Sequence, residues 1–149
     1  DAVKSEQERK DAPRGSACVL MVDDDPIQLR TGLRILTHLG YKVTTLESGR
    51  EALALLQQRA RSKQPAFDLL ILDMLLSEDR DGLEVLERAR ELFPGQRAIL
   101  VSGHAPSERA ERARGQGVQW LPKPFTVDTL ARAVSLGLGA DTSSAQPKE

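Results

Sequence analysis

The sequence predicts an α/β fold in which five parallel strands form one sheet with helices on both faces. Five short apolar runs alternate with amphipathic helical patterns, and this alternation is typical of parallel sheets built from strand–helix–strand units. Most of the runs are continuously apolar, as expected for strands that are covered on both faces. With 149 residues, the chain can bury such a core without a metal or a disulfide.

The predicted strands span residues 19–22, 42–46, 69–72, 98–101 and 118–121. The second strand mixes lysine and threonine with valine and leucine, which fits a place near the edge of the sheet.

Helix-boundary signals lie between these strands. Pro26 suits the first turn of a helix that ends at Gly40. Ser48 and Glu51 have the spacing of a capping box before the second helix. The remaining helices are expected from Gly82 to about residue 93, over about residues 107–114, and after Thr126.

Polar segments flank this pattern at both ends. They cannot bury enough apolar area to offset the entropy lost on ordering. We therefore predict a linker over residues 1–16, one domain over residues 17–139 and a flexible tail over residues 140–149. A short helix leading into the domain is the alternative for the first segment.

The charge balance argues against several classes of partner. The chain has 21 basic and 22 acidic residues, so composition gives no electrostatic reason to expect nucleic acid or a membrane surface. No apolar run approaches the roughly 20 residues of a membrane-spanning helix, and no signal peptide is visible. We expect a cytoplasmic domain with no direct contact to nucleic acid or membrane.

Residues suited to catalysis or metal binding follow four of the five strands. They are Asp23, Asp24 and Asp25 after the first, Asp73 after the third, Ser102 after the fourth and Lys123 after the fifth. Functional groups in open α/β sheets collect beyond the carboxyl ends of the strands. A single aspartate there commonly caps a helix, and Asp25 before Pro26 fits that role. The occurrence of such groups at four strand ends indicates a site.

This donor set fits phosphoryl chemistry. Neighbouring carboxylates repel one another and favour a hard cation such as Mg²⁺. A carboxylate can also act as a nucleophile and form an acyl phosphate. The new phosphoryl group would require the metal, an ammonium, a hydroxyl and backbone N–H groups around it.

The motifs resemble the receiver domains of two-component response regulators over residues 17–139. They read VLMVDDD at 19–25, LILD at 70–73, DG at 81–82, VSG at 101–103 and KPF at 123–125. The resemblance implies a flavodoxin-like, doubly wound (βα)5 fold with strand order 2-1-3-4-5. It also implies Mg²⁺ as the cofactor, for which Mn²⁺ can substitute, and a histidine kinase or histidine phosphotransfer domain as the partner.

The resemblance assigns a role to each site residue. Asp73 would accept the phosphoryl group from a phosphohistidine. Asp24 would bind Mg²⁺ directly and Asp23 mainly through water, with the carbonyl of Leu75 as a further ligand. Lys123, before a cis bond to Pro124, would pair with the phosphoryl oxygens.

The same resemblance implies a switch. Ser102 would move toward the phosphoryl group and Trp120 would follow it, although a plain structural aromatic is the alternative for Trp120. The change would reach the surface formed by the fourth helix, the fifth strand and the fifth helix. The first helix, with Ile27 and Leu33, would dock the kinase or phosphotransfer helices, and the domain could form a homodimer.

The sequence departs from the commonest family pattern in the loop after Asp73, which leaves the rigidity of that loop open, and Leu75 and His104 are expected to tune the lifetime of the phosphoryl group. The loop over residues 74–82 lacks the usual proline and is one residue longer. Leu75 and His104 lie where they could shield or attract the water that attacks the phosphoaspartate. A solvated loop histidine is the alternative for His104.

The pattern most resembles receivers at the C-terminal end of hybrid sensor histidine kinases. A membrane-bound parent would then tether the domain. The chain alone is not expected to be an enzyme, and it would catalyse only its own phosphorylation and dephosphorylation. Its parent would be a histidine kinase. A stand-alone regulator and a receiver from a longer regulator are the alternatives.

A phosphatase of the haloacid dehalogenase type is the rival from another class, with Asp23 as its nucleophile. That family needs a downstream acidic pair, and the only aspartates after Lys123 are Asp128 and Asp141. The rival also leaves Asp73 without a role.

Overall fold

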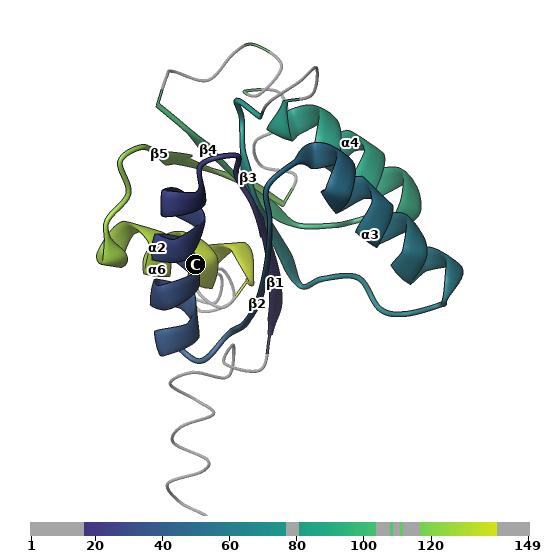
Figure 1. The fold of residues 1–149 in the computed structure, drawn as a ribbon, viewed down its shortest axis with the longest axis horizontal. Coiled ribbons are helices and arrows are strands. Elements are labelled where there is room, and N and C mark those ends of the chain that lie inside the picture. The colour runs from purple at the N-terminus through teal and green to yellow at the C-terminus, as the bar shows by residue number, and fades with distance from the viewer. Residues whose placement is uncertain (1–16, 77–80, 104–107, 109–110, 112–116, 140–149) are drawn as a thin grey trace, which may run out of the picture.

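The computed structural model describes residues 17–76, 81–103, 108, 111 and 117–139. The strands β1 (Cys18–Val22), β2 (Lys42–Leu46), β3 (Leu69–Asp73), β4 (Ala98–Ser102) and β5 (Val118–Pro122) form one parallel sheet in the order β2-β1-β3-β4-β5 (Figure 1). The helices are α2 (Pro26–His38), α3 (Gly49–Arg61), α4 (Gly82–Leu92) and α6 (Val127–Gly137). The predicted fold class and strand order are therefore confirmed. The helix expected over residues 107–114 falls largely outside the described residues.

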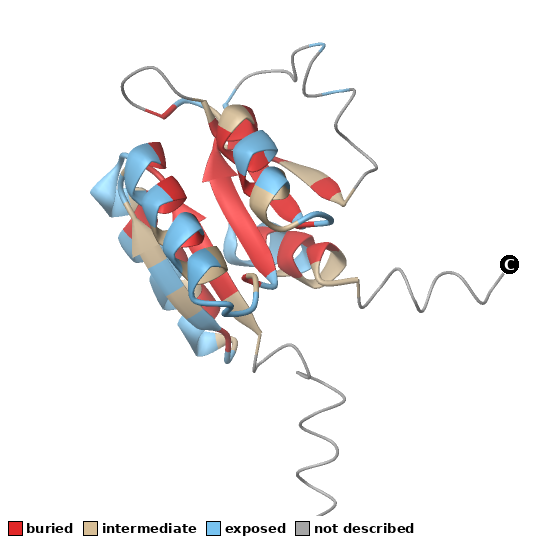
Figure 2. Cartoon of the chain, turned by 90° about the vertical axis from the view of Figure 1, so that its right-hand side faces the viewer, coloured by how far each residue is buried: buried red, intermediate tan, exposed pale blue. Residues whose placement is uncertain are grey.

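Helices cover both faces of the sheet. In Figure 1, α2 and α6 lie on one side of it and α3 and α4 on the other. Every residue of β3 and β4 is buried, whereas β2 at the edge has none that is fully buried (Figure 2). Continuous apolar runs thus form the centre of the sheet and the mixed run forms an edge, as predicted.

Alternate residues of the strands build two separate cores. Leu20, Leu70 and Leu100 belong to the core that also contains buried residues of α3 and α4. Met21 and Ile71 belong to the core shared with α2 and α6. Because successive side chains of a strand point to opposite faces, one short run supplies both layers.

The helix starts follow the sequence signals with one difference. The side chain of Asp25 caps α2 by accepting a hydrogen bond from the Ile27 N–H at 3.0 Å, and Pro26 occupies the first turn. Ser48 accepts from the Glu51 N–H at 3.1 Å. Glu51, however, accepts at 3.4 Å from the N–H of Glu47 rather than from that of Ser48, so only half of the predicted capping box forms.

Three strands extend one residue further at their carboxyl ends than predicted. Asp73 pairs with Val101 and Ser102 pairs with Pro122 in the ladders of the sheet. The Met74 N–H continues this pattern by donating to the Val101 carbonyl at 2.9 Å. Polar Asp73 and Ser102, and the proline at position 122, obscured the strand ends in the sequence, but parallel pairing holds their backbones in the sheet. Within the described residues, no helix is both long and apolar enough to cross a bilayer.

Candidate functional site

Three carboxylates meet at the carboxyl edge of the sheet. One oxygen from each of Asp23, Asp24 and Asp73 lies within 4.8 Å of the others. Asp23 and Asp24 follow β1, and Asp73 ends the neighbouring strand β3. Asp23 and Asp73 are buried, whereas Asp24 is exposed, so the cluster has one side open to solvent.

Each oxygen of the Asp73 carboxylate has its own donor. The N–H of Leu75 donates to Oδ1 at 3.2 Å, and the Lys123 ammonium donates to Oδ2 at 3.1 Å. Asp73 is only 4 % exposed, and the two donors fix the orientation of its carboxylate. A buried, oriented carboxylate beside a cation is arranged to act as a nucleophile.

Lys123 connects two of the acids. Its Nζ lies 3.1 Å from Oδ2 of Asp73 and 3.9 Å from Oδ2 of Asp23. Partial burial is the largest single influence on the pKa of Lys123, and it lowers that pKa. The hydrogen bond and charge of Asp73, together with the charges of Asp23 and Asp24, outweigh burial, so the pKa of Lys123 lies above its usual value. The backbone N–H of Lys123 donates to the Ser102 carbonyl at 2.8 Å, and the bond to Pro124 is cis, as the resemblance implied.

Asp23 is held in an environment that opposes its ionisation. Burial and the negative charge of Asp73 raise the pKa of Asp23 to about 6, although the Asp25 N–H donating to its Oδ1 at 2.9 Å and the charge of Lys123 act in the other direction. One ammonium therefore does not neutralise the cluster.

The donor set fits a hard divalent cation. Carboxylate oxygens are the ligands that Mg²⁺ prefers, and a site with one exposed side can retain the waters that Mg²⁺ releases reluctantly. Burial is the main cause of the raised pKa of Asp23, and a dication would offset the further contribution from the negative charge of Asp73. Asp23, Asp24 and Asp73 could hold such an ion.

The remaining predicted residues occupy neighbouring positions. Ser102 ends β4 and is 5 % exposed. Trp120 lies on β5, half-buried against the core shared with α3 and α4. Leu75 is 62 % exposed next to the Asp73 carboxylate. His104 lies outside the described residues.

A further positioning residue is Gly82, which the sequence analysis used as a helix start and as part of the Asp-Gly motif without giving it a role at the site. A Cβ built on it would lie 2.5 Å from the carbonyl oxygen of Asp73, so only a glycine lets α4 begin this close to β3. Its N–H donates to the Met74 carbonyl at 3.1 Å, and the preceding Asp81 pairs with Leu75 in an isolated bridge. The Asp-Gly pair was the available signal, but the close approach depends on tertiary packing.

Comparisons with known proteins agree with this geometry. The profile of the response regulator receiver domain matches residues 19–135. The alginate biosynthesis transcriptional regulatory protein AlgB of Pseudomonas aeruginosa is 38 % identical over 118 residues, which are 78 % of this chain and 25 % of that protein. The chain thus spans about a quarter of the length of this curated relative.

Solved structures give the same result. A CheY-like response regulator receiver domain protein from Methanospirillum hungatei JF-1 is 29 % identical with a TM-score of 0.71, over 86 % of this chain and 98 % of that one. The receiver domain of the hybrid histidine kinase CckA is also 29 % identical, with a TM-score of 0.66, over 82 % of this chain and 99 % of that one.

Proposed function

The chain belongs to the response regulator receiver domain family, and from this premise we propose that Asp73 is its phosphoacceptor. The observation that carries the proposal is the pairing of the buried Asp73 carboxylate with Lys123 at 3.1 Å inside a cluster of three acids. The receiver is a component of two-component signalling.

In the proposed reaction an oxygen of the Asp73 carboxylate attacks the phosphorus of a phosphohistidine. An O–P bond forms as the N–P bond breaks, and the imidazole nitrogen keeps the electron pair and takes up a proton. Lys123 supports the charge on the transferring phosphoryl oxygens, and the Leu75 N–H holds the attacking carboxylate in place.

Mg²⁺ is the proposed cofactor, and Mn²⁺ could replace it. Asp24 and Asp73 would bind it directly, Asp23 mainly through water, and the Leu75 carbonyl would be a further ligand. When bound, the ion supplies positive charge that offsets the negative charge of the phosphoryl group. The chain's own residues supply the nucleophile, the ammonium and the burial that limits water.

We assign the switch to Ser102 and Trp120. Ser102 lies at the end of the strand next to β3, and Trp120 follows on β5, the strand beyond. Movement of the Ser102 hydroxyl toward the phosphoryl group would loosen the packing around Trp120 and shift the surface that includes β5 and α6. Leu75, exposed beside the acceptor, and His104 are the proposed modulators of phosphoryl lifetime.

The proposed partner is a histidine kinase or histidine phosphotransfer domain, which would dock on α2. Ile27 and Leu33 are both exposed there, at 67 % and 38 %. A hybrid histidine kinase remains our proposed parent, consistent with the similarity to the CckA receiver, and AlgB shows that transcriptional regulators carry similar receivers. A cytoplasmic location, with no contact to nucleic acid, remains a proposal.

The phosphatase alternative is not supported. The family match is to receiver domains, and Asp73 rather than Asp23 has a donor on each carboxylate oxygen from Leu75 and Lys123.

The test is phosphorylation by acetyl phosphate in the presence of Mg²⁺, followed by intact mass. We expect one phosphoryl adduct on the wild type and none on Asp73→Asn. An adduct that persists in Asp73→Asn but disappears in Asp23→Asn would instead support the phosphatase alternative, and no adduct on the wild type would overturn both.

A further inference from the structure

The segment that follows β3 is held on two sides by backbone hydrogen bonds. Its loop, over residues 74–82, contains no proline that would fix a backbone angle, so its conformation depends on contacts. On one side the Met74 N–H donates to the Val101 carbonyl of β4 at 2.9 Å. On the other side the Met74 carbonyl accepts from the Gly82 N–H at 3.1 Å. Met74 is therefore fixed between β4 and the start of α4.

The isolated antiparallel bridge between Leu75 and Asp81 turns the backbone of Leu75 toward the acids. An antiparallel pair either exchanges its own N–H···O bonds or lies between bonds made by its flanking residues. The bond from Gly82 to Met74 is of the second kind. The Leu75 N–H instead donates to Oδ1 of Asp73 at 3.2 Å. Because extended backbone turns the N–H and C=O of one residue to the same side, the Leu75 carbonyl faces the side of the acids as well.

The side chains of Leu75 and Leu76 have opposite environments. Leu75 is 62 % exposed, whereas Leu76 is 8 % exposed and belongs to the core that contains buried residues of α3 and α4. Successive side chains of extended backbone point to opposite sides. Burial of Leu76 therefore fixes the rotation of the peptide that joins the two residues, and this peptide carries the Leu75 carbonyl.

The other side of the bridge is anchored by α4. Asp81 is the N-cap of that helix, and its Oδ1 accepts a hydrogen bond from the Glu84 N–H at 2.8 Å. Leu76 acts from the core, through apolar packing. It can therefore be replaced without removing any of the hydrogen bonds that hold the segment.

We propose that Leu76 is a positioning residue for the metal site: its burial holds the Leu75 carbonyl where it can bind Mg²⁺ and so sets the affinity for the ion. This inference rests on the proposed function, because the ion and the Leu75 ligand belong to that proposal. Replacing a residue that orients a metal ligand without touching the ion commonly weakens binding by about 10- to 100-fold. Leu76 orients the ligand through packing rather than through a hydrogen bond.

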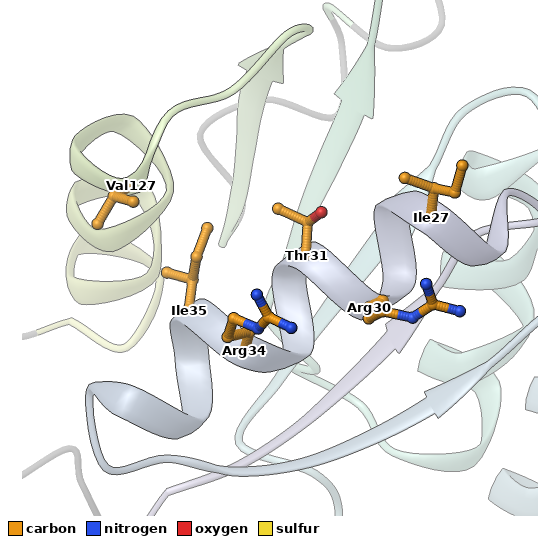
Figure 3. A pocket seen from close by; sticks show the side chains of 6 residues that line it. All are labelled: Ile27, Arg30, Thr31, Arg34, Ile35 and Val127. Carbon is orange, nitrogen blue, oxygen red and sulfur yellow. The ribbon is translucent and has the colours of Figure 1, made fainter.

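Leu76 lies on the other face of the sheet from the proposed docking surface. Figure 3 shows Ile27 and Ile35 on the side of α2 toward Val127 of α6, where they line a groove. Both of these helices pack on the core that does not contain Leu76. A change at Leu76 should therefore alter metal binding and leave the binding of the phosphodonor unchanged.

The test is Mg²⁺ binding by isothermal titration calorimetry, with circular dichroism to establish that each variant is folded. Leu76→Ala removes the packing, and Leu76→Met keeps most of the volume. Leu76→Val is a smaller truncation that keeps the test available if Leu76→Ala does not fold. Leu56→Ala is the matched control, because it removes the same atoms from the same core at a fully buried position of α3.

Leu76→Ala should raise the Kd for Mg²⁺ by about tenfold, and Leu76→Val should shift it in the same direction. Leu76→Met and Leu56→Ala should both stay within about twofold of the wild type. An unchanged Kd in the Leu76 truncations, or an equal loss of affinity in Leu56→Ala, would overturn the inference.

Labelling by acetyl phosphate separates this inference from the proposed function. The Mg²⁺ concentration that half-saturates labelling should rise in Leu76→Ala by the same factor as the Kd. A wild type that neither binds Mg²⁺ nor labels would overturn the proposed function itself, whereas a wild type that labels with the same half-saturation as Leu76→Ala would overturn the inference alone.

Transfer from a phosphorylated histidine phosphotransfer domain gives the last comparison. At saturating Mg²⁺, the KM of Leu76→Ala for this donor should equal that of the wild type. A raised KM together with an unchanged Kd for Mg²⁺ would assign Leu76 to donor binding and overturn the inference.

Discussion

The environment of Asp23 predicts how the metal-free protein responds to pH. The pKa of Asp23 rises from 3.8 to about 6 on folding because burial and Asp73 oppose its charge. In this range the folded chain binds a proton that the unfolded chain has already lost. The stabilisation by neutral Asp23 is therefore complete below about pH 4 and is lost as the pH rises through about 6.

The magnitude follows from the same two values. A difference of about two pH units, at about 1.36 kcal/mol for each, corresponds to about 3 kcal/mol in the free energy of unfolding. Asp23→Asn cannot ionise, so this pH dependence should vanish in the variant. Near pH 7 without metal, the variant should gain stability relative to the wild type.

The assay is urea unfolding with EDTA between pH 4 and pH 8, on the wild type and on Asp23→Asn. The difference between the two curves isolates Asp23 from the other carboxylates. Asp128→Asn, which removes an exposed acid on α6, is the matched control and should follow the wild type. Added Mg²⁺ should stabilise the wild type more than Asp23→Asn at pH 7. If the free energy of unfolding of the wild type minus that of Asp23→Asn stays flat, or rises, from pH 4 to pH 7, the reasoning is refuted.

Three further predictions concern the same edge of the sheet. Lys123→Met should slow labelling by acetyl phosphate by about 10²-fold, the usual cost of removing one preorganised donor. The control Lys42→Met, at an exposed position of β2, should label as fast as the wild type. If Lys123→Met also labels at the wild-type rate, Lys123 has no part in the reaction. Gly82→Ala should lower the free energy of unfolding by about 1–3 kcal/mol, because its Cβ would meet the Asp73 carbonyl at 2.5 Å. The control is Gly103→Ala, because a Cβ at Gly103 would have its nearest neighbour at 4.0 Å. It should lower the free energy of unfolding, measured with urea, by less than about 0.5 kcal/mol. Similar losses for Gly82→Ala and Gly103→Ala would contradict the packing argument. Because Trp120 is the single tryptophan, its emission should change on phosphorylation if it is the switch; an unchanged spectrum would leave it a structural aromatic.

Local patterns were sufficient to predict the sheet. The continuous apolar runs became the buried strands β3 and β4, and the mixed run became the edge strand β2. The apolar pattern of each run reflects how far that strand is buried, so the strands could be predicted without tertiary information. The strand order, in contrast, came from the resemblance to receivers, because the runs themselves do not state which strands are neighbours.

The site was predictable as a set of residues but not as a set of contacts. Strand ends in a parallel sheet meet at one edge, which brought Asp23, Asp73 and Lys123 together from distant parts of the sequence. The elevated pKa of Asp23 and the packing of Gly82 against the backbone of Asp73 depend on burial and on distances of a few ångströms. Such quantities arise only when the helices and strands have packed.

The central claim is that Asp73 carries the phosphoryl group, and borohydride reduction tests it most directly. Reduction of an aspartyl phosphate leaves homoserine at the acceptor, and peptide mapping then locates it. After labelling with acetyl phosphate and Mg²⁺, we predict homoserine at position 73 alone. Homoserine at position 23, or a stable phosphoryl group on another side chain with Asp73 intact, would contradict the account.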